Sequence, residues 1–207
     1  MLSKESGGFM PSTIGPFSAF VLAGGMSSRM QQDKALLRFR DHYLIEYAID
    51  VFQQLTPDIR IIGDPLKYEF LKRPVIPDRV ASHGPLCGIY TGLNISRNRY
   101  NLFLACDMPL MKPEFFRLLL EKIGKADAAV MRLNNGKVEP LAAVYSKAGL
   151  PTIEGNIALR HFKITDFLDR TWVAYPGEEA LSEIGLSARI FTNINTPEDL
   201  LSLESIS

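Results

Sequence analysis

A glycine-containing segment near the start of the chain combines exposed backbone N–H groups with positive charge. Gly24 and Gly25 follow a short apolar run, and Arg29 and Lys34 come soon after. Glycines let the backbone approach an anion closely, and the two basic side chains supply charge for phosphates. The spacing matches neither a GxGxxG fingerprint nor a P-loop. The segment therefore predicts a phosphate-binding loop of another type, with a plain Gly-Gly turn beside two solvated cations as the alternative.

Asp107 follows a strongly apolar run, Asn101 to Cys106. A carboxylate at the end of a buried central strand is placed for chemistry rather than for packing. One carboxylate, water and substrate phosphates make a typical Mg²⁺ site. Asp107 is therefore a candidate metal ligand and catalytic residue. The alternative is an ordinary turn or helix-capping aspartate.

A second carboxylate, Asp78, ends the segment PVIPD shortly before Gly84. It could contact a metal, a ribose or the N–H edge of a base. Glycine at position 84 favours a close approach of the backbone to a ligand or to another element. An ordinary acidic residue of a surface loop remains the alternative.

Two asparagines, Asn193 and Asn195, stand one residue apart ahead of Thr196 and Pro197. On a strand they would share one face. Their amide groups could hold a polar heterocycle or a phosphate without adding charge. The alternative is a pair of turn-forming residues ahead of the helix that Thr196 caps.

The elements that must position these residues alternate between strand-length apolar runs and helical patterns. We expect strands at 17–22, 59–62, 74–78, 101–106 and 126–133, and helices at 44–55, 86–95 and 113–122. This alternation predicts a three-layer α/β fold with a mostly parallel sheet. Ligands of such sheets bind outside the carboxyl ends of the strands, where the candidate residues lie.

The order is less regular after residue 133. The pattern predicts a strand running the other way at 138–145, an interrupted helix at 149–167, a short strand at 171–175 and a helix beginning after Thr196. We expect one domain over residues 17–207, preceded by a flexible lead-in over residues 1–16.

Composition narrows the function classes. The 207 residues carry 23 Lys and Arg against 23 Asp and Glu, so overall charge favours neither a nucleic acid nor a membrane surface as a partner. No apolar run reaches the roughly 18 residues that a membrane span needs. The first residues lack the features of a signal peptide. We therefore expect a cytoplasmic protein.

Together these segments resemble the molybdenum cofactor guanylyltransferases. The opening motif of that family is similar to LAGGxSxRMGxxKAL, and residues 22–36 are LAGGMSSRMQQDKAL. Further matches follow in the order of the family, namely Asp78, Gly84-Pro85-Leu86-Cys87-Gly88, Cys106-Asp107-Met108-Pro109, Glu139-Pro140-Leu141 and Asn193-Ile194-Asn195-Thr196-Pro197-Glu198-Asp199-Leu200.

The resemblance implies a Rossmann-like nucleotidyltransferase fold and transfer of GMP from GTP to molybdopterin carrying molybdenum, with release of pyrophosphate. It implies these roles: GTP binding by Leu22, Ala23, Gly24, Lys34 and Asp78, joint binding of Mg²⁺ and GTP by Asp107, and pterin contacts by Asn193 and Asn195. Arg29, Lys34 and the N–H groups of Gly24 and Gly25 would stabilise the departing pyrophosphate. GTP and molybdopterin are then its partners, together with cofactor-insertion proteins or the molybdoenzymes that receive the product.

The sequence departs from the family pattern at two places. Gln31 replaces a glycine of the opening motif, and Ile62-Gly63-Asp64 stands where the family often has an asparagine near the nucleotide. Two alternatives therefore stay open. One is a related cytidylyl- or sugar-phosphate nucleotidyltransferase, and the other is a non-catalytic nucleotide-binding relative.

Overall fold

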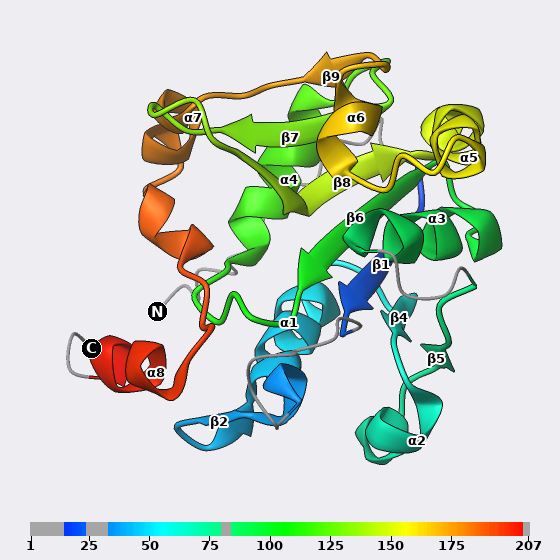
Figure 1. The fold of residues 1–207 in the computed structure, drawn as a ribbon. Helices are drawn as coiled ribbons and strands as arrows, with labels where there is room; N and C mark the ends of the chain where they lie inside the picture. Colours follow the sequence, from blue (N-terminus) through cyan, green and yellow to red (C-terminus); the bar gives the residue numbers. More distant parts are fainter. Residues whose placement is uncertain (1–14, 24–32, 80–83, 205–207) are drawn as a thin grey trace, which may run out of the picture.

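A seven-stranded sheet with the order β5-β4-β1-β6-β8-β7-β9 forms the middle layer in a computed structural model of the chain (Figure 1). The structure describes residues 15–23, 33–79 and 84–204. The strands of this sheet are β1 (Phe17–Leu22), β4 (Ile59–Ile62), β5 (Val75–Ile76), β6 (Tyr100–Ala105), β7 (Ala128–Arg132), β8 (Val138–Ser146) and β9 (Val173–Ala174).

The directions of the strands place most of the loops that hold candidate site residues at one edge of the sheet. β1 pairs in parallel with β4 and β6, β4 with β5, and β7 with β9. β8 is antiparallel to both β6 and β7, so it alone among the strands of this sheet runs the other way. The carboxyl ends of β1, β4, β5, β6 and β7 therefore meet at the same edge, where β8 begins.

Helices cover both faces of the sheet (Figure 1). One face packs against α1 (Leu44–Gln53), α4 (Pro113–Lys122) and α7 (Glu178–Glu183), and the other against α3 (Pro85–Ile95), α5 (Leu150–Ala158) and α6 (Ile164–Leu168). The remaining helices are α2 (Pro65–Tyr68) and α8 (Pro197–Glu204), with short 3₁₀ turns at Lys34–Leu36, Glu69–Leu71, Lys147–Gly149 and Ala188–Phe191.

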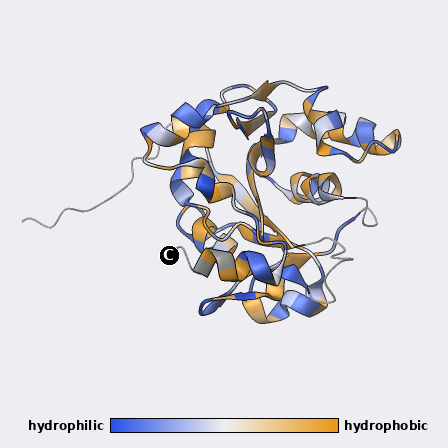
Figure 2. Cartoon of the chain, turned by 60° about the vertical axis from the view of Figure 1, so that its left-hand side comes forward, coloured by the Kyte–Doolittle hydropathy of each residue, from blue (hydrophilic) through white to orange (hydrophobic). Residues whose placement is uncertain are grey.

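Residue type explains why each layer forms. The helices carry both hydrophobic and hydrophilic residues (Figure 2), and the apolar residues of the six helices on the two faces pack against the sheet. β1 is buried along its whole length because helices cover both of its faces. The sheet thereby separates two apolar clusters, one on each face.

A third apolar cluster joins residues 37–44 to residues 194–203. It contains Leu37 and Leu44 with Phe39 of a small hairpin, β2 (Arg38–Phe39) and β3 (His42–Tyr43). Ile194, whose side chain has no exposed surface, and Leu203 of α8 complete it. This cluster brings the segment after residue 192 against the segment that carries Lys34.

The expected fold is confirmed, including a mostly parallel sheet and the reversed strand at 138–146. One prediction is wrong, because Asn193 and Asn195 lie in an extended loop and not on a strand. The predicted strand at 171–175 shortens to two residues, and the hairpin and α7 were not expected. The flexible lead-in over residues 1–16 falls almost wholly outside the described residues, so the domain division stays a prediction.

Candidate active site at the carboxyl ends of the strands

Asp107 lies just beyond the carboxyl end of β6, in the centre of the sheet. The N–H group of the preceding residue, Cys106, donates to the carbonyl of Leu22 at 3.2 Å, which joins the ends of β6 and β1. The Oδ1 atom of Asp107 is buried and has no hydrogen-bond partner among the described residues. A buried carboxylate oxygen without a partner is costly, so its retention points to a ligand.

Burial and two charged residues, Lys34 and Glu139, act on the carboxyl group of Asp107. Burial is the largest influence and raises its pKa above the ordinary value. Lys34 acts against burial and lowers the pKa, while the nearby Glu139 raises it further. Asp107 therefore holds its proton more readily than a surface aspartate does, unless a cation compensates for the lost solvation.

The asparagine pair flanks a residue that anchors it beside Asp107. The N–H group of Ile194 donates to the backbone carbonyl of Asp107 at 2.9 Å. Because Ile194 points into the third apolar cluster, its neighbours Asn193 and Asn195 are placed next to the candidate metal ligand. The Oδ1 atom of Asn193 is also buried without a hydrogen-bond partner among the described residues.

Lys34 and Asn195 are in direct contact across 161 positions of sequence. The Nζ atom of Lys34 donates to Oδ1 of Asn195 at 2.8 Å. Lys34 begins a 3₁₀ turn that Asp33 caps, since Oδ1 of Asp33 accepts from the N–H group of Ala35 at 3.1 Å. The residue expected at the phosphates and one expected at the acceptor thus meet at the same place.

The helix after the asparagines is capped as expected. Thr196 Oγ1 accepts from the N–H group of Asp199 at 3.2 Å, and Oδ2 of Asp199 accepts from the N–H groups of Thr196 and Asn195 at 2.9 and 2.7 Å. These backbone hydrogen bonds lower the pKa of Asp199. The reciprocal capping fixes the backbone of Asn195 against the start of α8.

Asp78 lies at a different part of the same edge. It follows β5, and its Oδ1 atom accepts from Oγ1 of Thr91 of α3 at 2.8 Å. Neighbouring strands are about 4.8 Å apart, so the three steps from β5 to β6 separate the strand ends by roughly 14 Å. Asp78 is therefore too far from Asp107 to share one metal ion, and only a ligand the size of a nucleotide would reach both.

Leu22 and Ala23 form the end of β1 that leads into the glycine segment. The N–H group of Ala23 donates to the carbonyl of Ile62 at 2.9 Å, which fixes this end against β4. The predictions for Gly24, Gly25 and Arg29, and the departure at Gln31, lie outside the described residues. The structure therefore gives the two anchors of that segment, Ala23 and Asp33.

A family model described as the MobA-like NTP transferase domain matches residues 19–172. A probable molybdenum cofactor guanylyltransferase of Carboxydothermus hydrogenoformans is 36% identical over 186 residues, which cover 90% of this chain and 94% of the relative. A probable enzyme of the same name from Flavobacterium johnsoniae is 34% identical, with coverage of 90% and 95%. The chain belongs to the molybdenum cofactor guanylyltransferase family.

A solved structure agrees with this family assignment. The crystal structure of molybdopterin-guanine dinucleotide biosynthesis protein A from Archaeoglobus fulgidus superposes with a TM-score of 0.78 at 28% sequence identity. The match covers 91% of this chain and 97% of that one. The Rossmann-like nucleotidyltransferase fold that the resemblance implied is therefore confirmed, while the roles of individual site residues stay predictions.

Glu139 was noted in the sequence as a family match, but no role was assigned to it. It is 4% exposed at the start of β8, and its Oε1 atom lies 2.7 Å from Nζ of Lys137. Burial and, to a smaller extent, the charge of Glu139 raise the pKa of Asp107. The sequence could have indicated a functional role for Glu139, because a glutamate inside an otherwise apolar strand is buried, and buried carboxylates are usually paired or functional.

The donor set fits a magnesium ion only in part. Carboxylate and amide oxygens are suitable ligands for this cation, and two of them here lack hydrogen-bond partners among the described residues, on Asp107 and Asn193. Among the described residues, no group of three or more His, Cys, Asp or Glu side chains could hold a metal ion. An ion at Asp107 would therefore take its remaining ligands from substrate and water.

Proposed function

We propose that this protein transfers GMP from GTP to molybdopterin carrying molybdenum, releasing pyrophosphate and forming molybdopterin guanine dinucleotide. The observation that carries this proposal is the contact between Lys34 and Asn195 beside Asp107. It joins a cation suited to phosphates, an amide suited to a heterocycle and a carboxylate suited to a metal at one strand edge. The names of the relatives support the choice of substrates.

The chemistry is an in-line substitution at the α-phosphate of GTP. A phosphate oxygen of the acceptor forms a bond to the α-phosphorus, and the bond from that phosphorus to the oxygen bridging to the β-phosphate breaks. The electron pair leaves with pyrophosphate. The attacking oxygen is already ionised near neutral pH, so no general base is needed. Positioning and charge compensation supply the catalysis.

Each residue of the site has one task in this scheme. Asp107 would hold Mg²⁺, which neutralises charge on the triphosphate when bound. Lys34 stabilises the charge that develops on pyrophosphate, with Arg29 and the N–H groups of Gly24 and Gly25 as further donors. Leu22 and Ala23 lead the backbone to the phosphates, and Asp78 contacts the nucleoside. Asn193 and Asn195 hold the acceptor.

The contact between Lys34 and Asn195 bears on the order in which GTP and the acceptor bind. The ammonium group of Lys34 donates to the amide oxygen of Asn195. A triphosphate would compete for the same ammonium and release that amide for the acceptor. GTP binding should therefore precede or strengthen acceptor binding.

The test is turnover by the full chain with molybdopterin, Mg²⁺ and each of the four nucleoside triphosphates in turn. Pyrophosphate release and the guanine dinucleotide product should appear with GTP at the highest kcat/KM. Faster release with CTP would make the protein a cytidylyltransferase. Binding of GTP without turnover would make it a non-catalytic relative. Omitting Mg²⁺, with chelator added, tests the metal requirement in the same assay.

The site of action that we propose is the cytoplasm, where GTP and Mg²⁺ are available. Within the described residues, none of the helices combines the length and the apolar character that crossing a membrane requires. Fractionation of cells that express the full chain would test this. Recovery with the membrane pellet after a salt wash would contradict it.

A further inference from the structure

Tyr68, the last residue of α2, makes contact with both anchors of the glycine segment. Its side chain is 1% exposed, and its hydroxyl oxygen lies 2.9 Å from the carbonyl oxygen of Ala23 and 2.9 Å from Oδ2 of Asp33. Ala23 precedes the segment 24–32, and Asp33 follows it. A phenol has one proton, so the hydroxyl donates to one of these acceptors at a time.

The protonation of Tyr68 suits this double contact. Burial, and next the charge of Asp33, raise the pKa of Tyr68 far above its ordinary value. The residue is therefore a neutral hydrogen-bond donor at any physiological pH. The Nζ atom of Lys67 is a second donor to Oδ2 of Asp33, at 3.0 Å, so this carboxylate oxygen keeps a partner when Tyr68 donates to Ala23.

Asp33 connects Tyr68 to the turn that begins with Lys34. While Oδ2 accepts from α2, Oδ1 caps the 3₁₀ turn that begins with Lys34. A shift of Asp33 therefore moves the backbone from which the ammonium of Lys34 extends. On the other side, Ala23 is the last described residue of the segment that leads from β1. The end of β1 and the turn of Lys34 are thus linked through the hydroxyl group of Tyr68.

Gly63 shows that the chain leaves room for this ring. A Cβ atom added at Gly63 would lie 2.7 Å from Cε2 and 3.2 Å from Cδ2 of Tyr68, and 3.4 Å from Cβ of Ala23. Contacts below 3.0 Å force something to move. A side chain at position 63 would therefore displace the Tyr68 ring.

We propose that Tyr68 is a positioning residue for triphosphate binding, because its buried hydroxyl lies within hydrogen-bond distance of both residues that flank the glycine segment, Ala23 and Asp33. This proposal rests on the function proposed above, since it concerns the same nucleotide. Tyr68 does not touch the substrate in this scheme and acts through Ala23 and Asp33. The expected signature is a selective loss of affinity for the triphosphate.

The first experiment compares Tyr68→Phe with wild type in the full chain. We expect the dissociation constant and KM for GTP to rise about 5- to 10-fold, the effect of one hydrogen bond, while the KM for molybdopterin is unchanged. Tyr100→Phe is the control, because its hydroxyl donates to the carbonyl of Gly124 at 2.7 Å, far from this edge. It should leave both constants unchanged.

Two further variants separate positioning from loss of folding. Gly63→Ala should displace the ring and weaken GTP binding as Tyr68→Phe does, whereas Gly155→Ala has open space and should not. Asp33→Asn combined with Tyr68→Phe should weaken GTP binding less than the product of the two single effects, since both belong to one contact. The proposal would be overturned if the double variant lost GTP affinity by the full product of the two single effects. An equal loss of affinity for GTP and molybdopterin would overturn it as well.

The binding measurement also distinguishes failure of this proposal from failure of the proposed function. Each variant is titrated with all four nucleoside triphosphates in the presence of Mg²⁺. If wild type prefers a triphosphate other than GTP, the proposed function fails, while the effect of Tyr68→Phe on that triphosphate still decides its role. If wild type binds GTP and Tyr68→Phe binds it equally well, the positioning role is wrong. If Tyr68→Phe does not fold, the GTP affinities of Gly63→Ala and Asp33→Asn test the positioning role instead.

Discussion

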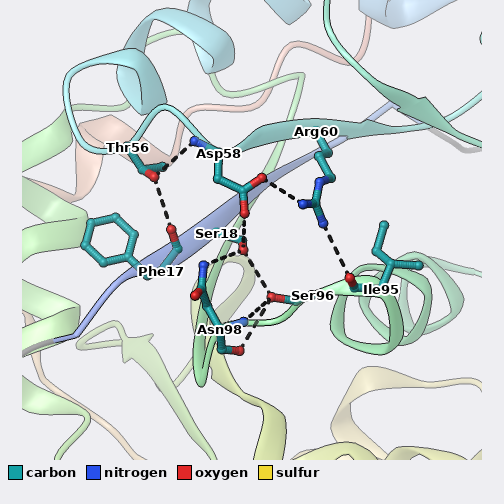
Figure 3. Close-up of polar contacts among 8 residues, drawn as sticks. All are labelled: Phe17, Ser18, Thr56, Asp58, Arg60, Ile95, Ser96 and Asn98. Carbon is teal, nitrogen blue, oxygen red and sulfur yellow. Dashed lines mark hydrogen bonds and ion pairs between the residues drawn. The ribbon is translucent and has the colours of Figure 1, made fainter.

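At the amino ends of β1, β4 and β6, polar side chains are hydrogen-bonded to one another, whereas at the carboxyl ends buried oxygens lack partners. Ser18 donates to Oδ2 of Asp58 at 2.6 Å, lies 3.1 Å from the hydroxyl of Ser96 and accepts from Asn98 at 3.0 Å (Figure 3). Arg60 completes the group through an ion pair with Asp58 at 2.9 Å (Figure 3).

The carboxyl ends have the opposite character. Oδ1 of Asp107 and Oδ1 of Asn193 are buried without a hydrogen-bond partner among the described residues. Asn101, near the amino ends, also has an unpaired Oδ1, but its amide nitrogen donates to two backbone carbonyls. Polar side chains that hydrogen-bond to one another stabilise the fold, while buried polar atoms without a partner at the carboxyl end of a strand indicate a ligand site. The comparison predicts that mutations at the two ends have different consequences.

The largest effect should come from Asp107→Asn. Loss of the negative charge removes the proposed metal ligand, which is worth several kcal/mol of transition-state stabilisation. We expect kcat to fall at least about 100-fold at saturating Mg²⁺. Steady-state pyrophosphate release measures this. Wild-type kcat in the variant would remove Asp107 from the catalytic site.

The same substitution should not lower stability, which a purely structural aspartate would do. Burial raises the pKa of Asp107, so the folded protein binds its proton more tightly than the unfolded chain does. Wild-type stability therefore falls as pH rises from the ordinary value through the raised one, and it stays lower above that window. In metal-free protein at neutral pH, we expect Asp107→Asn to melt at the same temperature as wild type or higher. The difference should shrink as pH falls through the window.

Lys34→Ala should produce the next largest effect. An ammonium that hydrogen-bonds to a charged phosphate contributes about 1.5–3 kcal/mol, so kcat/KM for GTP should fall roughly 10- to 150-fold. The melting temperature should change little. Lys122→Ala at the exposed end of α4 is the matched control and should leave kinetics unchanged. Kinetics like those of wild type in Lys34→Ala would make this lysine a surface residue only.

Asn193→Ala and Asn195→Ala should separate the two substrates. Loss of an amide that would contact the acceptor in the complex costs about 1–3 kcal/mol, or roughly 5- to 150-fold in kcat/KM for molybdopterin. Asn193→Ala should leave the KM for GTP unchanged. Asn195→Ala should also alter it, because Lys34 loses its partner. Separate titrations of the two substrates decide this, and a lower melting temperature with intact kinetics would assign both residues to the turn alone.

The smallest kinetic effect should follow Ser18→Ala, which tests the amino ends. Its hydroxyl has no exposed surface and contacts three polar side chains, which would lose a partner. We expect a loss of about 1–3 kcal/mol in the free energy of unfolding, with kcat and both KM values near wild type. Denaturant unfolding and the turnover assay on the same preparation measure this. A selective change in KM would show that the two ends are not independent.

Local sequence was sufficient to predict most of the fold. Apolar runs bounded by helical patterns placed the strands of the seven-stranded sheet and α1, α3 and α4 within a few residues, because burial on both faces demands continuous apolar residues. The same reasoning placed Asp107 and Asp78 at strand ends. It gave no role for Glu139, because the position of this residue near Asp107 depends on the pairing of β8 with β6.

The sequence by itself determined the chemical groups and, for Asp78 and Asp107, the edge of the sheet where they lie, since each of these two follows an apolar run that forms a parallel strand. Tertiary structure decided which of them meet. The contact of Lys34 with Asn195 depends on the packing of Ile194 against Leu37 and Leu44, and no local pattern encodes a pairing across 161 positions. The position of Tyr68 against Ala23 and Asp33 has the same origin, because a short helix after β4 must fold back over the end of β1 to bring its hydroxyl there.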